Sequence, residues 1–211
     1  EAVEKKCSGK PAKIVVADKK PKTESAPLLF SLTELQKMAA RMGYSPDAVL
    51  KAAQALYEKH KLTSYPRTEC QYAPESEHAK AKAVISAILR NFGDSWSIPN
   101  LYEVSRKSKA WDDKKLAEHF AIFPLATSVS TKDLSKIELD IYKLICRQYL
   151  AQFFPNYEFM STTIVAAVAD EKFKATGAVP LIDGWRALYG GGTSAQKNKS
   201  DDAHQEKLPN V

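Results

Sequence analysis

Tyr65 and Arg67 lie two residues apart in the turn-rich segment from Leu62 to Pro74, with Pro66 between them. A phenol has an ordinary pKa of about 10, so a nucleophilic tyrosine needs a nearby cation or hydrogen-bond donor to stabilise the developing charge. The guanidinium of Arg67 stays charged and suits a phosphate oxygen, and Pro66 restricts the backbone between the two side chains. This pair favours phosphodiester transesterification. On local chemistry alone, a packed tyrosine ring with a solvated hydroxyl remains the alternative.

His119 is a second candidate, because it precedes a short apolar run that ends at Pro124. An imidazole can donate a hydrogen bond to a phosphate oxygen, and near a scissile phosphate it would share the charge with Arg67. A histidine at the boundary of a buried run is the structural alternative.

Both stretches resemble motifs of one family, the type IA DNA topoisomerases. The first reads Tyr-Pro-Arg-Thr, an acidic residue, Cys, a polar residue, Tyr, any residue and Pro, an order closest to the topoisomerase III branch. The second, from Trp111 to Pro124, resembles the histidine motif of the family, in which His precedes Ala-Ile-x-Pro. The chain departs from the usual pattern with Glu69 in place of Asp, Phe120 at an often polar position, and Leu125 in place of Thr.

The resemblance implies a function and a set of site residues. The family cleaves and rejoins single-stranded DNA through a 5′-phosphotyrosine intermediate and so changes DNA topology without ATP. The catalytic residues would be Tyr65, Arg67 and His119, and the DNA-binding residues would be Thr68, Glu69 and Tyr72.

The resemblance also implies a cofactor and partners that this chain does not supply. In the complete enzyme Mg2+ is held by a separate acidic metal-binding domain, and this sequence has no Asp-x-Asp motif and no Gly-x-x-x-x-Gly-Lys phosphate loop. We therefore expect no metal site in the chain. We expect its partners to be single-stranded DNA and that acidic domain, and we expect the isolated chain not to cleave DNA.

A non-catalytic helix-turn-helix DNA-binding module is the alternative from another functional class. Two helical patterns joined by a tight turn, at 31–43 and 45–60, are compatible with it. Such a module needs base-reading side chains on its second helix and no particular tyrosine, whereas the catalytic hypothesis requires Tyr65, Arg67 and His119 to converge.

Composition and charge narrow the class of protein only modestly. The net charge is +6, but residues 1–22 carry +4 of it, so charge by itself is weak evidence for DNA binding. No apolar run approaches the ~18 to 20 residues that span a bilayer, which predicts no membrane association. Cys7, Cys70 and Cys146 are widely spaced, which predicts free thiols and a cytoplasmic protein.

The hydrophobic patterns predict an α+β fold. Helices are predicted at 31–43, 45–60, 74–93 and 130–154, with caps at Ser31, Ser45 and Ser130, and strands at 12–17, 162–165 and 173–179. Residues 21–27 are predicted to be a connector. With the resemblance, this predicts a helical, winged-helix-like domain at 28–154 that carries Tyr65. It is inserted into a β-rich arch domain made of 1–27 and 155–211, with a flexible loop at 190–206 and a strand beginning at Leu208.

Overall fold

The computed structural model describes residues 1–190, which form two compact units. One unit comprises residues 1–25 and 156–184, and the other comprises residues 26–155 and 185–190. The predicted loop beyond residue 190 and the predicted strand at Leu208 lie outside the described residues.

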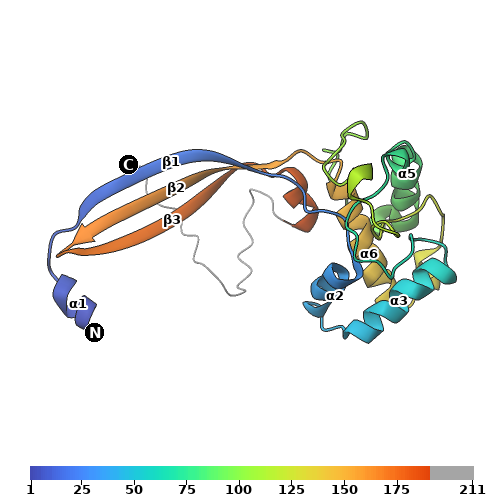
Figure 1. Cartoon of the computed structure of the whole chain (residues 1–211), viewed down its shortest axis with the longest axis horizontal. Coiled ribbons are helices and arrows are strands. Elements are labelled where there is room, and N and C mark those ends of the chain that lie inside the picture. The colour runs from blue at the N-terminus through green and yellow to red at the C-terminus, as the bar shows by residue number, and fades with distance from the viewer. Residues whose placement is uncertain (191–211) are drawn as a thin grey trace. The chain divides into compact units, whose positions relative to one another are not determined.

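The first unit is a three-stranded antiparallel sheet in the order β1-β2-β3, preceded by the short helix α1 (Ala2–Cys7) (Figure 1). The strands are β1 (Lys13–Glu24), β2 (Tyr157–Val168) and β3 (Glu171–Ile182). Pairing of β1 with β2 confirms the expectation that the N-terminal strand lies beside the segment after Tyr157. The mixture of helices and sheet confirms the α+β class.

The predicted end of the first strand is wrong, because β1 continues to Glu24 through the stretch that we expected to be a connector. Pro21 is paired in register with Met160. Proline removes one backbone donor, but β1 lies at the edge of the sheet, where a strand needs hydrogen-bond partners on one side only.

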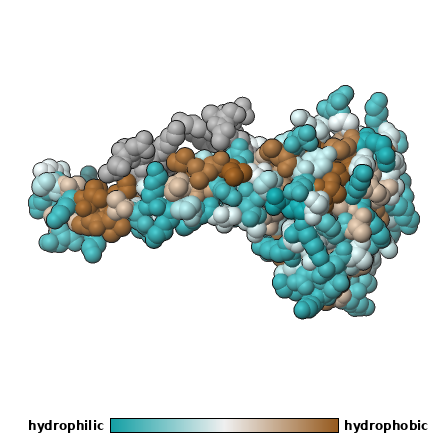
Figure 2. Space-filling model, turned by 90° about the horizontal axis from the view of Figure 1, so that it is seen from above, coloured by the Kyte–Doolittle hydropathy of each residue, from teal (hydrophilic) through white to brown (hydrophobic). Residues whose placement is uncertain are grey.

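A tight turn joins β2 to β3. Ala169 and Asp170 both have positive φ, at 49° and 69°, the left-handed conformation that a two-residue hairpin turn requires. Only Tyr157 is buried among the hydrophobic side chains described in this unit. Figure 2 shows apolar residues on the surface of the sheet, and the large exposed ones are Ile14, Val15, Val16, Phe173, Val179, Leu181 and Ile182.

The second unit is helical and contains the hydrophobic core. Its α-helices are α2 (Leu32–Ala40), α3 (Pro46–Glu58), α4 (Glu75–His78), α5 (Ala81–Phe92) and α6 (Lys136–Ala151). Short 3-10 turns are η1 (Gly93–Ser95), η2 (Asp113–Lys115) and η3 (Thr131–Asp133), and η4 (Gly184–Tyr189) returns to this unit from β3. Of these helices, α6 contributes the most buried side chains, and α2 and α3 both pack against it.

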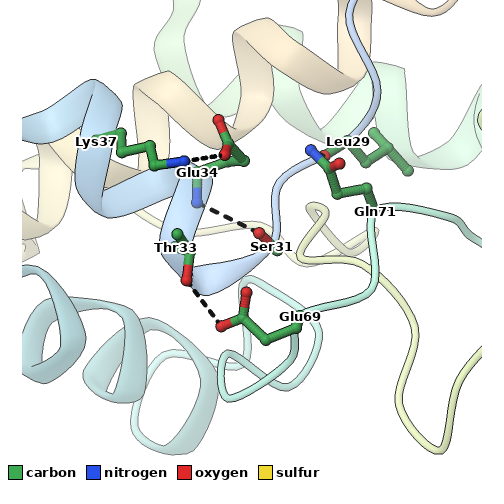
Figure 3. A network of polar contacts seen from close by, with 7 residues as sticks. All are labelled: Leu29, Ser31, Thr33, Glu34, Lys37, Glu69 and Gln71. Atoms are coloured by element: carbon green, nitrogen blue, oxygen red, sulfur yellow. Dashed lines mark hydrogen bonds and ion pairs between the residues drawn. The ribbon is translucent and has the colours of Figure 1, made fainter.

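Serine caps begin both α2 and α3, as predicted. Ser31 Oγ accepts from the backbone N–H of Glu34, and Ser45 Oγ accepts from that of Ala48 (Figure 3 shows the first). Ser31 makes this single capping bond without a reciprocal bond from Glu34, whose carboxylate pairs with Lys37 at 2.7 Å. Gly43, at φ 86°, lies in the turn between the two helices.

Two predicted helices have different bounds in the structure. The predicted helix 74–93 divides into α4 and α5, and the first of these is held separately by a bond from the Glu75 N–H to Asp113 Oδ1. The predicted helix from Ser130 begins only after Ser135, since Leu134 is extended (φ −92°, ψ 138°). Ser135 and Glu138 form a full capping box, a stronger start signal than the single serine at 130.

We predict that Ser135→Ala lowers the free energy of unfolding by about 1 kcal/mol, because it removes the side-chain acceptor of the first turn of α6. The matched control is Ser130→Ala, whose side chain makes no capping bond and should change stability by less than about 0.5 kcal/mol. Urea denaturation followed by circular dichroism measures both. Equal losses would contradict the observed start of α6.

Candidate active site

The segment that carries Tyr65 is hydrogen-bonded to the stretch that carries His119. Ser64, which is 5% exposed, donates its hydroxyl to the carbonyl of Ala121 at 2.8 Å. The same oxygen accepts from the N–H of Phe123 at 2.9 Å, and the N–H of Ser64 donates to the Phe123 carbonyl at 2.9 Å. One buried serine therefore makes three bonds across the two motifs.

Further bonds extend this pairing on both sides of Tyr65. The N–H of Leu125 donates to the Leu62 carbonyl at 2.8 Å, and the N–H of Ala121 donates to the Tyr72 carbonyl at 2.8 Å. The hydroxyl of Thr68 donates to the His119 carbonyl at 3.2 Å. Hydrogen bonds thus join both ends and the middle of the tyrosine segment to the stretch that carries His119, and they fix the position of His119 beside Tyr65.

Tyr65 is half-buried between two other rings. Its ring centroid lies 4.7 Å from that of His119, at an interplanar angle of 52°. On α3, Tyr57 packs against it edge to face, with centroids 5.5 Å apart. His119 itself is exposed to solvent, and Lys61 Nζ lies 5.7 Å from the centre of the Tyr57 ring. The Tyr65 phenol thus lies beside an accessible imidazole, and the cation lies against the neighbouring Tyr57 ring.

Arg67 is exposed and is held by Gln54 of α3. With the Gln54 amide oriented so that its oxygen faces the guanidinium, this oxygen accepts from Arg67 Nη2 at 2.9 Å and Nε at 3.2 Å. Gln54 is three residues before Tyr57, so one side of α3 positions Arg67 and also contacts Tyr65. The remaining donors of the guanidinium can meet a phosphate.

The three predicted DNA-binding residues have different surroundings. Thr68 is 7% exposed, and its hydroxyl also accepts from the N–H of Cys70, so its polar groups are engaged within the protein. Glu69 is exposed and accepts from the Thr33 hydroxyl of α2 at 3.0 Å (Figure 3). The half-buried ring of Tyr72 has Lys115 Nζ 5.0 Å from its centre.

Lys115 is the cation that lies beside this part of the loop. Its ammonium pairs with Asp112 at 3.3 Å, and the hydrogen bond to that carboxylate raises the pKa of Lys115 above its usual value. The side chain therefore stays protonated at neutral pH and adds positive charge next to Tyr72.

The donors of this loop and its neighbours are the His119 imidazole beside Tyr65, the Arg67 guanidinium held by Gln54 and the Lys115 ammonium beside Tyr72, and all three suit an anion. Mg2+ prefers carboxylate and other oxygen ligands. Across residues 1–190, no group of three or more His, Cys, Asp or Glu side chains could hold a metal ion. The site therefore does not fit a magnesium ion.

Two residues of this site were not found from the sequence. Neither Gln54 nor Tyr57 belongs to a local motif, so no sequence pattern points to either. Their spacing of three places them on one side of α3, but only packing against the tyrosine segment shows what they contact.

All three cysteines are free, as expected. In the described part of the chain, no helix is long and apolar enough to cross a membrane.

Comparisons with known proteins agree with the motifs. A family model described as DNA topoisomerase matches residues 1–211. The chain is 38% identical over 212 residues to DNA topoisomerase 3 of Pasteurella multocida, covering all of this chain and 32% of that protein. It is 40% identical over 203 residues to DNA topoisomerase 3 of Salmonella typhimurium, covering 96% of this chain and 30% of that protein.

A solved structure supports the fold. Full-length topoisomerase I from Thermotoga maritima matches 96% of this chain and 34% of its own, with a TM-score of 0.63 and 18% sequence identity. The chain thus spans about a third of the length of the relatives that it matches. On the match of the family model over its whole length, the chain belongs to the DNA topoisomerase family.

Proposed function

We propose that this chain is the part of a type IA DNA topoisomerase that carries the nucleophilic tyrosine. The observation that carries the proposal is the 4.7 Å approach of the Tyr65 and His119 rings, from motifs 54 residues apart, with Arg67 anchored on the helix that also contacts Tyr65. A helix-turn-helix regulator needs none of these contacts, so they favour catalysis over that alternative.

The proposed reaction exchanges one phosphoester bond for another. The phenolic oxygen of Tyr65 attacks a DNA phosphate, and the bond from phosphorus to the 3′-oxygen breaks. The phenol loses one proton, and the leaving 3′-oxygen gains one and becomes the 3′-hydroxyl. The 5′-phosphate stays bonded to the tyrosine. Reversal by the same 3′-hydroxyl reseals the strand, so bond energy is conserved and no ATP is needed.

Arg67 and His119 stabilise the charge that develops on the phosphate. Arg67 presents the guanidinium donors that Gln54 does not bind, and His119 presents a ring nitrogen from the exposed side of the loop. Donors that are held in place before the reaction stabilise charge without reorganising, which is the usual origin of large effects on rate.

The proposed DNA-binding residues have different roles, and they are Thr68, Glu69 and Tyr72. Tyr72 offers a half-buried ring face beside Lys115, suited to a base and its phosphate. The buried hydroxyl of Thr68 supports binding by holding the loop against the His119 carbonyl. Glu69 acts from an exposed position that Thr33 orients.

For the complete enzyme we propose a domain arrangement and the location of the magnesium site. Residues 1–27 and 155–211 form a β-rich arch domain into which the winged-helix-like domain 28–154 is inserted, and the pairing of β1 with β2 supports this division. Mg2+ is bound by carboxylates of an acidic domain outside this chain, because the residues around Tyr65 do not suit it. Single-stranded DNA is the substrate, and the enzyme works in the cytoplasm.

We predict that Tyr65→Phe, in the full-length enzyme, abolishes covalent capture of DNA. The substitution removes one hydroxyl and keeps the ring between Tyr57 and His119, so non-covalent DNA binding should stay within about two-fold. Denaturing gels of labelled oligonucleotide measure capture, and filter binding measures affinity. A variant that still trapped DNA would refute the assignment of the nucleophile.

We predict that Arg67→Ala slows cleavage by about 10²-fold, as expected when one positioned donor to the developing charge is lost. Gln54→Leu should slow cleavage less, by roughly ten-fold, because the guanidinium remains but is no longer oriented. Single-turnover cleavage rates at saturating DNA separate these effects from binding. The control is Lys51→Gln, an exposed change on the same helix that should leave the rate unaltered.

We predict that the 211-residue chain alone binds single-stranded DNA weakly and does not cleave it. The slope of log affinity against log salt should reflect about two to four phosphates, in keeping with the modest positive surplus. Fluorescence anisotropy across a salt series measures the slope. Cleavage of a labelled oligonucleotide by the chain with magnesium, in the absence of any acidic domain, would contradict the proposal.

A further inference from the structure

A concave site lies in the helical unit, apart from the residues around Tyr65. It is a cavity of about 350 Å3, within the range of roughly 300 to 1,000 Å3 that is typical of small-molecule sites. Leu28, Phe30 and Met38 contribute apolar surface, and Trp185 and Tyr189 contribute aromatic surface. Tyr65, Arg67 and His119 do not line it.

One face of α2 supplies the charged side of this cavity. Glu34, Lys37 and Arg41 line it, and their spacing of three and four places them on the same side of the helix. Figure 3 shows Lys37 paired with Glu34, at 2.7 Å. Arg41 is exposed, and no carboxylate described in residues 1–190 lies within ion-pair distance of it. The lining therefore carries one uncompensated positive charge, on Arg41.

The aromatic side of the cavity is held in place by α6. The Tyr189 hydroxyl donates to Gln148 Oε1 at 2.7 Å, and Gln148 Nε2 donates to the carbonyl of Leu28. Arg147 lies 5.3 Å from the centre of the Tyr189 ring, and Trp185 meets Tyr189 edge to face, with centroids 5.7 Å apart. Burial also raises the pKa of Tyr189 to about 12, so its hydroxyl stays neutral. The rings are thus oriented before any ligand arrives.

The cavity is connected to the active-site segment through α2 and Gln71. Gln71 lines the cavity and donates to the Leu29 carbonyl at 3.4 Å (Figure 3), six residues after Tyr65 in the same loop. Glu69, also in that loop, binds Thr33 at the start of α2. The Gln71 amide oxygen leaves an acceptor for a ligand.

We propose that this cavity is a subsite for one nucleotide of a DNA single strand, separate from the scissile phosphate. The base packs against Trp185, Tyr189 and the apolar floor, and the phosphate binds Arg41, with Lys37 beside it. Rings and amides suit a base, and a guanidinium suits a phosphate. This inference rests on the proposed function, which makes DNA the substrate. A free mononucleotide offers the same chemistry, so the test compares both.

The experiment follows the tryptophan indole N–H signals of the 211-residue chain by NMR. The sequence has three tryptophans, and Trp185→Phe identifies the signal of the cavity. Trp111 is buried, does not line the cavity and serves as the internal reference. The chain is titrated separately with a short oligothymidylate, with thymidine monophosphate and with inorganic phosphate. We expect the Trp185 signal to shift and saturate with the oligonucleotide, at a lower concentration than with the mononucleotide.

Arg41→Gln tests the phosphate contact. Loss of one charge-assisted bond should weaken oligonucleotide binding at Trp185 about ten-fold and lower the salt slope by about one. The matched control is Lys82→Gln, an exposed change of the same charge on α5, which should leave the affinity unchanged. Both positions are exposed, so folding is checked simply by the unchanged Trp111 signal.

Several outcomes would overturn the inference. A Trp185 signal that does not respond to the oligonucleotide would overturn it, and so would an affinity of Arg41→Gln for the oligonucleotide equal to that of Lys82→Gln. Equal affinity for the mononucleotide would assign the cavity to a free nucleotide, and an equal response to inorganic phosphate would make it an anion site only. Covalent DNA capture by the full-length enzyme and its Tyr65→Phe variant is measured independently of the cavity. A negative result at Trp185 therefore does not affect the assignment of Tyr65 as the nucleophile.

Discussion

The hydroxyl of Ser64 is the interaction on which the geometry of the site depends. Because it donates to Ala121 and accepts from Phe123, it satisfies two backbone groups that burial would otherwise leave without partners. Tyr65 is the next residue, and His119 lies two residues before Ala121. The distance between the phenol and the imidazole is therefore set by a bond that is inaccessible to solvent. Because the imidazole is exposed, a ligand can approach it without disturbing the contact that positions it.

The helix α3 is the second support of the site. Ser45 and Pro46 define its start, and its buried side chains Val49, Ala52, Ala53 and Leu56 fix its rotation against the core. That rotation directs Gln54 toward Arg67 and Tyr57 toward Tyr65. A reactive side chain on a loop gains rigidity when a packed helix holds it, and preorganised donors are the ones that contribute most to catalysis.

The two units of the chain are stabilised in different ways. The helical unit has a continuous apolar core to which α6 contributes Ile141, Ile145 and Tyr149, among others. The sheet depends on its ladders of backbone hydrogen bonds, with most side chains partly or fully exposed. The candidate site is in the unit with the core, where close packing restricts the positions of side chains.

The sequence by itself determined the residue types of the site and the local signals around them. Tyr65, Pro66 and Arg67 are adjacent, and the caps at Ser31 and Ser45 act over three residues, so local chemistry is sufficient to read them. Ser135 with Glu138 is an equally local signal, and it marks the start of α6 more strongly than Ser130 does. Only the tertiary structure decided that Gln54 binds Arg67, that Ser64 joins two motifs, and that β1 continues through Pro21 at the sheet edge. The two residues of such a contact are separated in the sequence by 13 positions for Gln54 and Arg67, and by more than 100 positions for the pairing of β1 with β2. The continuation of β1 through Pro21 also depends on which strand lies at the edge of the sheet. These contacts follow from how whole elements pack, which no local pattern of residues encodes.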